Sequence, residues 1–254
     1  YEMTSSLVGS EMCIRDSKGI EHMPNLTVLD VSYNKIPDAL AVEGYGKLTR
    51  LDCDHNPLTS LSVKGCKALR ELKANDCFYQ DEYGKAIYTL AAIDLTGCGA
   101  LETVNIEDNS IAVLDLHDCV SLREIRCAYN DLTTIDFSSC TKMTAITCRN
   151  NPLHGLTLDV SMCPDLLYLA CWEAGLAGVD VSGCPKLQEL LVYYNDLNSI
   201  DISACPALTR VDLHGTKISA LDLGNCSKLS WIDLKFNTIC LLYTSPSPRD
   251  STSS

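Results

Sequence analysis

Positive charge and aromatic residues are both scarce in this 254-residue chain. Lysine and arginine number 20 against 33 aspartates and glutamates, which gives a formal net charge of −13. This acidic balance argues against nucleic acid and against an anionic membrane surface as the main partner. Aromatic residues make up 6% of the chain and hydrophobic residues 46%, so the sequence predicts a core that is mostly aliphatic.

Long apolar segments and catalytic signatures are missing as well. No apolar run reaches the roughly 18 residues that a membrane-spanning helix needs, so we predict no membrane span in this segment. The sequence contains no G-x-S-x-G, no H-E-x-x-H and no glycine loop that could cradle a phosphate. The five histidines are scattered, and His214 is interpreted as a surface residue at a variable strand position. We therefore expect no enzyme activity, no catalytic residue and no cofactor.

The two ends of the chain resemble translated sequencing-adapter DNA. One DNA that encodes residues 240–254 has a reverse complement that, in another frame, encodes residues 3–16 of the same chain. Independent coding sequences would not agree in this way by chance. We therefore expect residues 1–17 and 240–254 to be adapter-derived and outside the regular fold, except near Leu242, which falls close to a repeat position. The remaining residues, 18–239, are expected to be part of a longer natural protein.

An internal repeat of about 21 residues fills most of the chain. Its coils begin at Leu26, Leu48, Leu69, Leu101, Leu122, Met143, Leu166, Leu187, Leu208 and Leu229. The shared pattern is L-x-x-L-x-C/V/L-x-x-N-x-L-x-x-L-D-V-S-x-C. Burying the six apolar side chains of one coil contributes on the order of 10 kcal/mol. Ordering each residue costs about 1–2 kcal/mol, so one coil cannot fold unless its neighbours share the core.

This pattern resembles the leucine-rich repeat, and in its short form it is similar to repeats in surface proteins of gut bacteria. The resemblance covers ten coils, residues 26–239. It implies a β-rich leucine-rich-repeat solenoid with a curved parallel sheet on the concave face, short strands or turns on the convex face, and few or no helices. An insertion at residues 78–89 cannot be absorbed by the coil period, so we expect it to project as a loop.

An asparagine column and a cysteine column recur with the repeat. The asparagines are Asn34, Asn56, Asn109, Asn130, Asn151, Asn195 and Asn237. They stand where the chain turns after the first strand, and we expect their amides to bond backbone groups that the turn leaves unpaired. The cysteine column is Cys66, Cys98, Cys119, Cys140, Cys163, Cys184, Cys205 and Cys226. We interpret these and five further cysteines as reduced, buried thiols, with a disulfide framework as the alternative.

An aspartate column occupies the L-D-V-S part of the repeat. Its members are Asp94, Asp115, Asp136, Asp159, Asp180, Asp201 and Asp222. The carboxylates are expected to accept hydrogen bonds from nearby backbone N–H or serine hydroxyl groups. Calcium lodged between coils is the alternative, but the spacing matches no known calcium loop. Zinc is disfavoured because the sequence has no C-x-x-C, and we predict no metal site.

The resemblance places ligand recognition on the variable outward positions of the first strands. Aromatic and apolar residues concentrate there late in the chain, and the candidate contacts are Tyr129, Tyr168, Trp172, Leu191, Tyr193, Tyr194 and Trp231. Trp172 and Tyr193 share a column in adjacent coils, about 4.8 Å apart, and predict one exposed aromatic platform. Packing of the rings against each other is the alternative. The early coils present charged residues such as Arg50, Asp52 and Asp54 instead.

These features predict a non-catalytic binding module that recognises a protein or a glycan through its concave face. The resemblance favours an extracellular or cell-surface location on a bacterium. Two alternatives stay open: a targeting or scaffold arm of a larger protein, and a cytoplasmic location, which many free thiols would favour. The sequence does not identify the partner.

Overall fold

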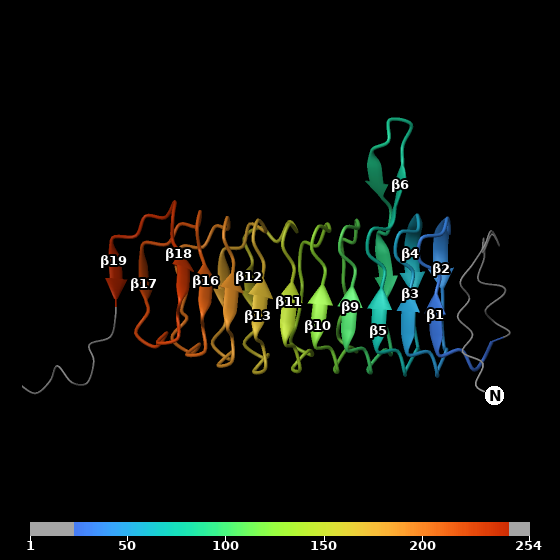
Figure 1. Cartoon of the computed structure of the whole chain (residues 1–254), viewed down its shortest axis with the longest axis horizontal. Helices are drawn as coiled ribbons and strands as arrows, with labels where there is room; N and C mark the ends of the chain where they lie inside the picture. The colour runs from blue at the N-terminus through green and yellow to red at the C-terminus, as the bar shows by residue number, and fades with distance from the viewer. Residues whose placement is uncertain (1–22, 244–254) are drawn as a thin grey trace, which may run out of the picture. The chain divides into compact units, whose positions relative to one another are not determined.

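The computed structural model describes residues 23–243, and the chain divides into two compact units, the first ending at Cys140 and the second beginning at Thr141. Each unit is a stack of coils built from short β-strands, and residues 23–243 contain no helix (Figure 1). No helix of the described chain could therefore cross a membrane. The predicted parallel-strand solenoid is confirmed. The predictions for residues 1–17 and 244–254 lie outside the described residues.

Unit 1 carries one strand of its main sheet in each of its five coils. The strands are β1 (Val28–Asp30), β3 (Arg50–Asp52), β5 (Glu71–Lys73), β9 (Thr103–Asn105) and β10 (Glu124–Arg126). They pair in parallel and in repeat register, so that Leu51 lies opposite both Leu29 and Leu72. A second sheet consists of β2 (Asp38–Ala41), β4 (Leu58–Ser62) and β8 (Ala92–Asp94).

Unit 2 repeats this arrangement. Its main-sheet strands are β11 (Ala145–Thr147), β13 (Tyr168–Ala170), β15 (Glu189–Leu191), β16 (Arg210–Asp212) and β18 (Trp231–Asp233). Two smaller pairs are β12 (Thr157–Asp159) with β14 (Gly178–Asp180), and β17 (Ala220–Asp222) with β19 (Leu241–Tyr243). Leu242 lies opposite Leu221, so the exception anticipated at that residue extends over three residues of the segment predicted to lie outside the fold. The adapter origin of that segment stays a prediction.

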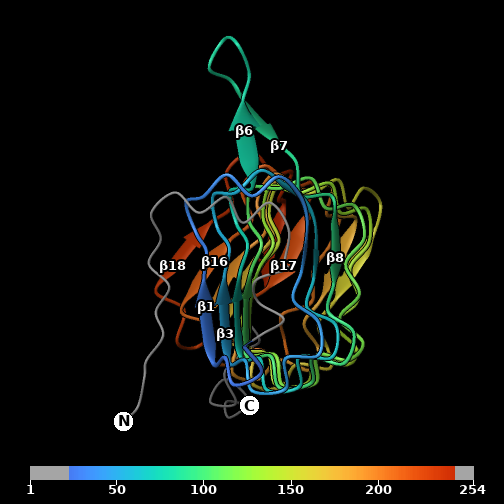
Figure 2. The same cartoon turned by 90° about the vertical axis from the view of Figure 1, so that its right-hand side faces the viewer.

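The insertion in the third coil is an ordered hairpin. Strands β6 (Phe78–Gln80) and β7 (Ala86–Tyr88) pair antiparallel, and they project from the coils of unit 1 (Figures 1 and 2). The Asp81 carboxylate closes the tip by accepting the backbone N–H groups of Tyr83 and Lys85, each at 2.9 Å. The insertion therefore projects as predicted, but as a hairpin closed by hydrogen bonds at its tip and not as an irregular loop.

The asparagine column bonds the backbone as predicted. Asn109 Nδ2 donates to the carbonyl oxygens of Ala74 (2.8 Å) and Ile106 (2.9 Å), while its Oδ1 accepts the N–H of Cys77 at 3.2 Å. One amide thus satisfies buried groups in two successive coils.

The residue before each asparagine position has a left-handed backbone, which the sequence did not reveal. Nine non-glycine residues have φ between +51° and +57°: Tyr33, His55, Asp76, Asp108, Tyr129, Asn150, Glu173, Tyr194 and Phe236. The remaining coil, which begins at Leu208, has Gly215 at this position with φ +64°. Non-glycine residues rarely adopt this conformation. In the seven coils that have an asparagine at the next position, the asparagine bonds therefore stabilise a strained backbone; Cys77, Ala174 and Thr216 take that position in the other three.

The thirteen predicted thiols are free and buried. In the cysteine column they donate to main-chain oxygens of the preceding coil, as Cys66 does to Val42 (3.0 Å) and Cys184 to Val160 (3.2 Å). Burial raises the pKa of Cys184 to about 12, so its thiol stays protonated at neutral pH. The predicted burial is confirmed, and the reduced state of these cysteines stays a prediction. Cys148 and Cys171, which occupy a core strand position outside the cysteine column, contact each other instead, with their Sγ atoms 2.8 Å apart.

The aspartate column forms local turns. Each carboxylate accepts the backbone N–H two residues later, as Asp136 does from Ser138 at 2.8 Å and Asp201 from Ser203 at 2.9 Å. The bond from the Ser138 backbone lowers the pKa of Asp136. Within residues 23–243 no group of three or more potential ligands could hold a metal ion. The local hydrogen bonds therefore explain why aspartate recurs at this position, and the geometry of the column gives no support to the calcium alternative.

Candidate functional site

The outward face of the main sheet in unit 2 carries three stacked rings. Trp172 and Tyr193 stack with centroids 5.0 Å apart and planes 12° apart, and Tyr193 and His214 stack at 4.4 Å and 14°. All three residues are seventh in their coils, two residues after the end of a main-sheet strand. Because adjacent parallel strands lie about 4.8 Å apart, rings at one repeat position meet face to face. We call these three residues the aromatic stack.

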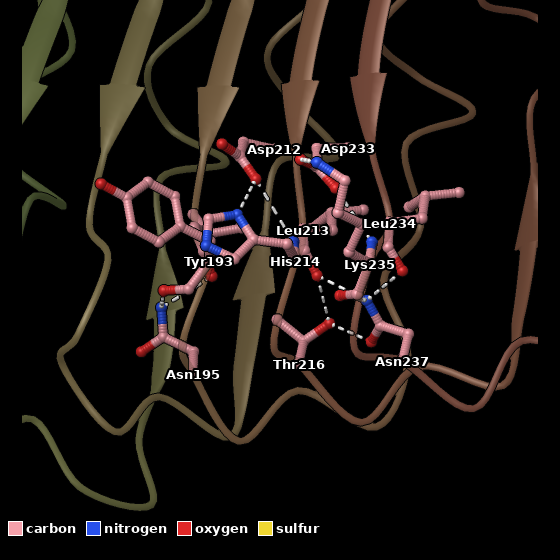
Figure 3. Close-up of polar contacts among 11 residues, drawn as sticks. Tyr193, Asn195, Asp212, Leu213, His214, Thr216, Asp233, Leu234, Lys235 and Asn237 are labelled. Carbon is pink, nitrogen blue, oxygen red and sulfur yellow. Dashed lines mark hydrogen bonds and ion pairs between the residues drawn. The ribbon is translucent and has the colours of Figure 1, made fainter.

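Charged groups hold both ends of the aromatic stack. The Arg149 guanidinium carbon lies over the Trp172 ring, 4.9 Å from its centroid. At the other end, His214 Nδ1 lies 2.6 Å from Asp212 Oδ1, a contact that requires the proton on Nδ1 and fixes the imidazole (Figure 3). Lys235, next in the same column, bonds Asp233 instead, at 2.9 Å.

Tyr194 packs against the side of the aromatic stack. Its ring meets Tyr193 edge-on at 5.7 Å and His214 at 4.6 Å, and it is 49% exposed. A Cβ at Gly215 would overlap the Tyr194 ring, so glycine makes this packing possible. The sequences Tyr193-Tyr194 and His214-Gly215, one coil apart, therefore fit each other.

The aromatic stack exposes ring edges more than ring faces. Each inner face is covered by its neighbour, and the outer face of Trp172 is covered by Arg149. Trp172 and Tyr193 are half-buried. Burial, with help from Asp212 and Glu173, raises the pKa of Tyr193, so its phenol remains a hydrogen-bond donor at neutral pH. The surface can therefore offer O–H and N–H donors between rigid, weakly positive ring edges.

Three predicted contacts lie in other columns of unit 2. Tyr168 belongs to the third repeat position, as does Trp231, whose ring is covered by the Arg210 guanidinium at 4.7 Å. Leu191 was expected to be exposed, and this is wrong, because only 7% of it is accessible. Its register partners Ala170 and Asp212 are buried as well, since the central column lies between the two columns that carry the large rings.

Tyr129 is placed in unit 1, where it is 44% exposed with φ +52°, so it is not a member of the aromatic stack. Sequence reasoning missed His214 and Arg149. The available signal was the column itself: His214 follows Tyr193 by one period, and Arg149 precedes Trp172 by the longer coil that starts at Met143.

No family model matches the sequence, and no curated protein matches it. Among solved structures, the chain is similar to the functional domain of InlJ from Listeria monocytogenes, which includes a cysteine ladder. The identity is 24% and the TM-score 0.66, over 87% of this chain but only 56% of that one. The fold is a leucine-rich-repeat solenoid.

Other leucine-rich-repeat structures agree. One is the Leptospira interrogans leucine-rich-repeat protein LIC12759, at 14% identity and TM-score 0.54 over 91% of this chain and 87% of that one. Another is the ectodomain of the Arabidopsis thaliana receptor kinase GASSHO1/SCHENGEN3, solved in complex with CASPARIAN STRIP INTEGRITY FACTOR 2. It is 18% identical with TM-score 0.66 over 85% of this chain and 28% of that chain. At these identities the similarity establishes the leucine-rich-repeat fold.

Proposed function

We propose that this leucine-rich-repeat chain is a non-catalytic module that recognises a protein through the strand face of unit 2. The observation that carries the proposal is the aromatic stack, three rings fixed at both ends and left half-exposed on a sheet face. Rigid aromatic side chains lose little entropy on binding and dominate many protein interfaces. Arg149 and Asp212 add preorganisation, because they hold the outer rings before any partner arrives.

The geometry favours a protein over a glycan. Sugars bind aromatic residues mainly by laying their C–H groups on an open ring face. Both faces of Trp172 are covered by Arg149 and Tyr193, and both faces of Tyr193 by Trp172 and His214. Ring edges with phenol and indole donors suit backbone carbonyls and small apolar side chains of a protein.

We propose an extracellular or bacterial cell-surface location for the module. The similar structures include the functional domain of InlJ and a receptor ectodomain, which supports this assignment. The free thiols are compatible with it, because buried thiols with a raised pKa react slowly even under oxidising conditions. The His214–Asp212 pair is assigned to fixing the stack, since it orients the imidazole ring that stacks on Tyr193.

Selection from a displayed library of folded extracellular protein domains, run beside an array of immobilised glycans, tests the proposal. Binders should lose at least about tenfold in affinity against Trp172→Ala, the loss typical of a hot-spot truncation. Trp231→Ala makes the same change at a 40% exposed position outside the aromatic stack. Since Trp231 is also a predicted contact, it should cost clearly less than Trp172→Ala if recognition centres on the aromatic stack. Selected domains whose affinity is unchanged by Trp172→Ala, or binding to glycans alone, would refute protein recognition by this surface.

A further inference from the structure

A pocket of about 490 Å³ lies on the strand face of unit 1. Its floor comes from β5, β9 and β10, which contribute Lys73, Asn105 and Arg126 among others, and one wall comes from the turns that follow β1 and β3. Polar and charged side chains line most of it, so its chemistry differs from that of the aromatic stack.

The cations of this pocket are already paired with glutamates of their own strands. Lys73 Nζ lies 3.4 Å from Glu71 Oε1, and Arg126 Nε lies 2.8 Å from Glu124 Oε1. These pairs leave the lining without an uncommitted positive charge that could attract an anion.

Asp54 is a carboxylate without a counter-ion. Within the described residues it takes part in no ion pair, and its closest bond is from the Asn75 backbone N–H to Oδ1, at 2.9 Å. Asp52, two residues earlier, differs because Arg50 approaches it at 3.3 Å and Lys73 at 4.0 Å. Burial raises the pKa of Asp54 to about 6, despite the bond from Asn75. An acidic group in this state gains most from an added cation.

Buried hydrogen-bonding capacity beside Asp54 is also unused. Asn75 Nδ2 donates to Asp76 Oδ2 at 2.9 Å, but Asn75 Oδ1 is buried and has no hydrogen-bond partner. His55 Nδ1 is likewise buried and unpartnered. Since an unpaired buried acceptor costs free energy, the pocket is suited to a ligand that brings N–H donors.

An aromatic wall completes the pocket. Tyr33 stacks on His55 with centroids 4.1 Å apart and planes 13° apart, and Tyr33 is 75% exposed. Phe78 of the hairpin meets His55 edge-on at 6.4 Å, and Tyr88 supports Phe78 at 5.8 Å. Exposed aromatic faces attract cations, in particular guanidinium groups.

We propose that the unit 1 pocket binds a cationic nitrogen group, a guanidinium or primary ammonium, which pairs with Asp54, donates to Asn75 Oδ1 and packs against Tyr33. This site is independent of the aromatic stack, because it lies in the other unit and selects by charge. The group could come from a free small amine or from an arginine or lysine side chain of a protein.

Calorimetric titration of the full chain at pH 7.5 with three probes tests the proposal. N-acetyl-arginine amide should bind, while N-acetyl-citrulline amide, which has the same shape without the charge, should bind at least about tenfold more weakly. Agmatine distinguishes the sources: equal binding supports a free guanidinium as the ligand, and tighter binding of the arginine amide supports a protein side chain. Equal binding of the citrulline probe, or no binding of either cation at tens of millimolar, would overturn the assignment.

Variants locate the site. Asp54→Asn should weaken binding of the arginine probe by about tenfold or more, and Tyr33→Ala by several-fold. Asp38→Asn is the matched control, since Asp38 is an exposed carboxylate of unit 1 on its other sheet, and it should leave binding unchanged. Melting curves establish that each variant is folded. Unchanged binding to a folded Asp54→Asn variant would contradict the proposed site.

Discussion

Replacing Asp54 with asparagine is expected to stabilise the chain at neutral pH while removing the charge that the unit 1 pocket offers. Burial raises the pKa of Asp54 from 3.8 to about 6, ahead of the smaller influences of the Asn75 bond, Asp52, His55 and Lys73. The folded state therefore disfavours the ionised carboxylate. An asparagine oxygen can still accept the Asn75 N–H, so the substitution removes the charge and keeps the bond.

The size of the effect follows from the two pKa values. Their difference is about 2 pH units, worth about 3 kcal/mol for a fully buried group. Asp54 is half-buried, and solvent screening reduces this to about 1 kcal/mol. The penalty is absent well below pH 3.8, where Asp54 is protonated in both states. It grows as the pH rises from about 3.8 to about 6, because the unfolded carboxylate ionises first, and it is complete above 6.

Urea unfolding of Asp54→Asn and the parent protein at about pH 3.0, 5.0, 6.0 and 7.5 measures this dependence. The free energies of unfolding should agree at about pH 3.0 and diverge in favour of the variant by about 1 kcal/mol at about pH 7.5. Asp38→Asn should show no such divergence. A variant that is less stable at pH 7.5, or a difference that does not change with pH, would refute the reasoning.

Three further results are expected. Trp172→Ala should lower the free energy of unfolding by about 1–2 kcal/mol and leave unfolding cooperative. A double-mutant cycle with Tyr193→Ala should give a coupling energy of about 1 kcal/mol, and additive effects would contradict the stacking of the two rings. Gly215→Ala should lower the free energy of unfolding by at least about 1 kcal/mol. It should also change the near-ultraviolet circular dichroism, because the Tyr194 ring must move; an unchanged spectrum would contradict the packing of Tyr194 on Gly215. Thiol titration should find about thirteen more reactive cysteines after denaturation than before, and recovery of only a few would indicate disulfides.

The repeat could be predicted in detail because the spacing of the apolar residues gives its period directly. Each coil start, such as Leu101, is followed two residues later by a main-sheet strand, here Thr103–Asn105. The roles of the asparagine, cysteine and aspartate columns followed in the same way, since each has local or adjacent-coil partners. The left-handed residues went unseen, because tyrosine, glutamate and phenylalanine there carry no propensity for that conformation.

The candidate sites were less predictable because they depend on how neighbouring coils pack. The pairing of Trp172 with Tyr193 followed from register, but the mutual covering of their faces depends on side-chain orientation. Leu191 reads as an outward strand position and becomes buried only because large side chains flank its column. The pocket at Asp54 was visible only as charge in the early coils. Its missing counter-ion emerges once Lys73 and Arg126 are seen to pair elsewhere.

The chain has only two tryptophans, one inside the aromatic stack and one outside it, and their indole N–H signals give the most direct test of recognition by unit 2. Two-dimensional ¹⁵N–¹H spectra would follow a titration with the tightest domain from the library selection, with Trp231→Ala assigning the signals. The account predicts that the Trp172 indole signal shifts or broadens in proportion to the bound fraction while that of Trp231 changes little. A complex that moves only the Trp231 signal, or neither signal, would contradict the central claim.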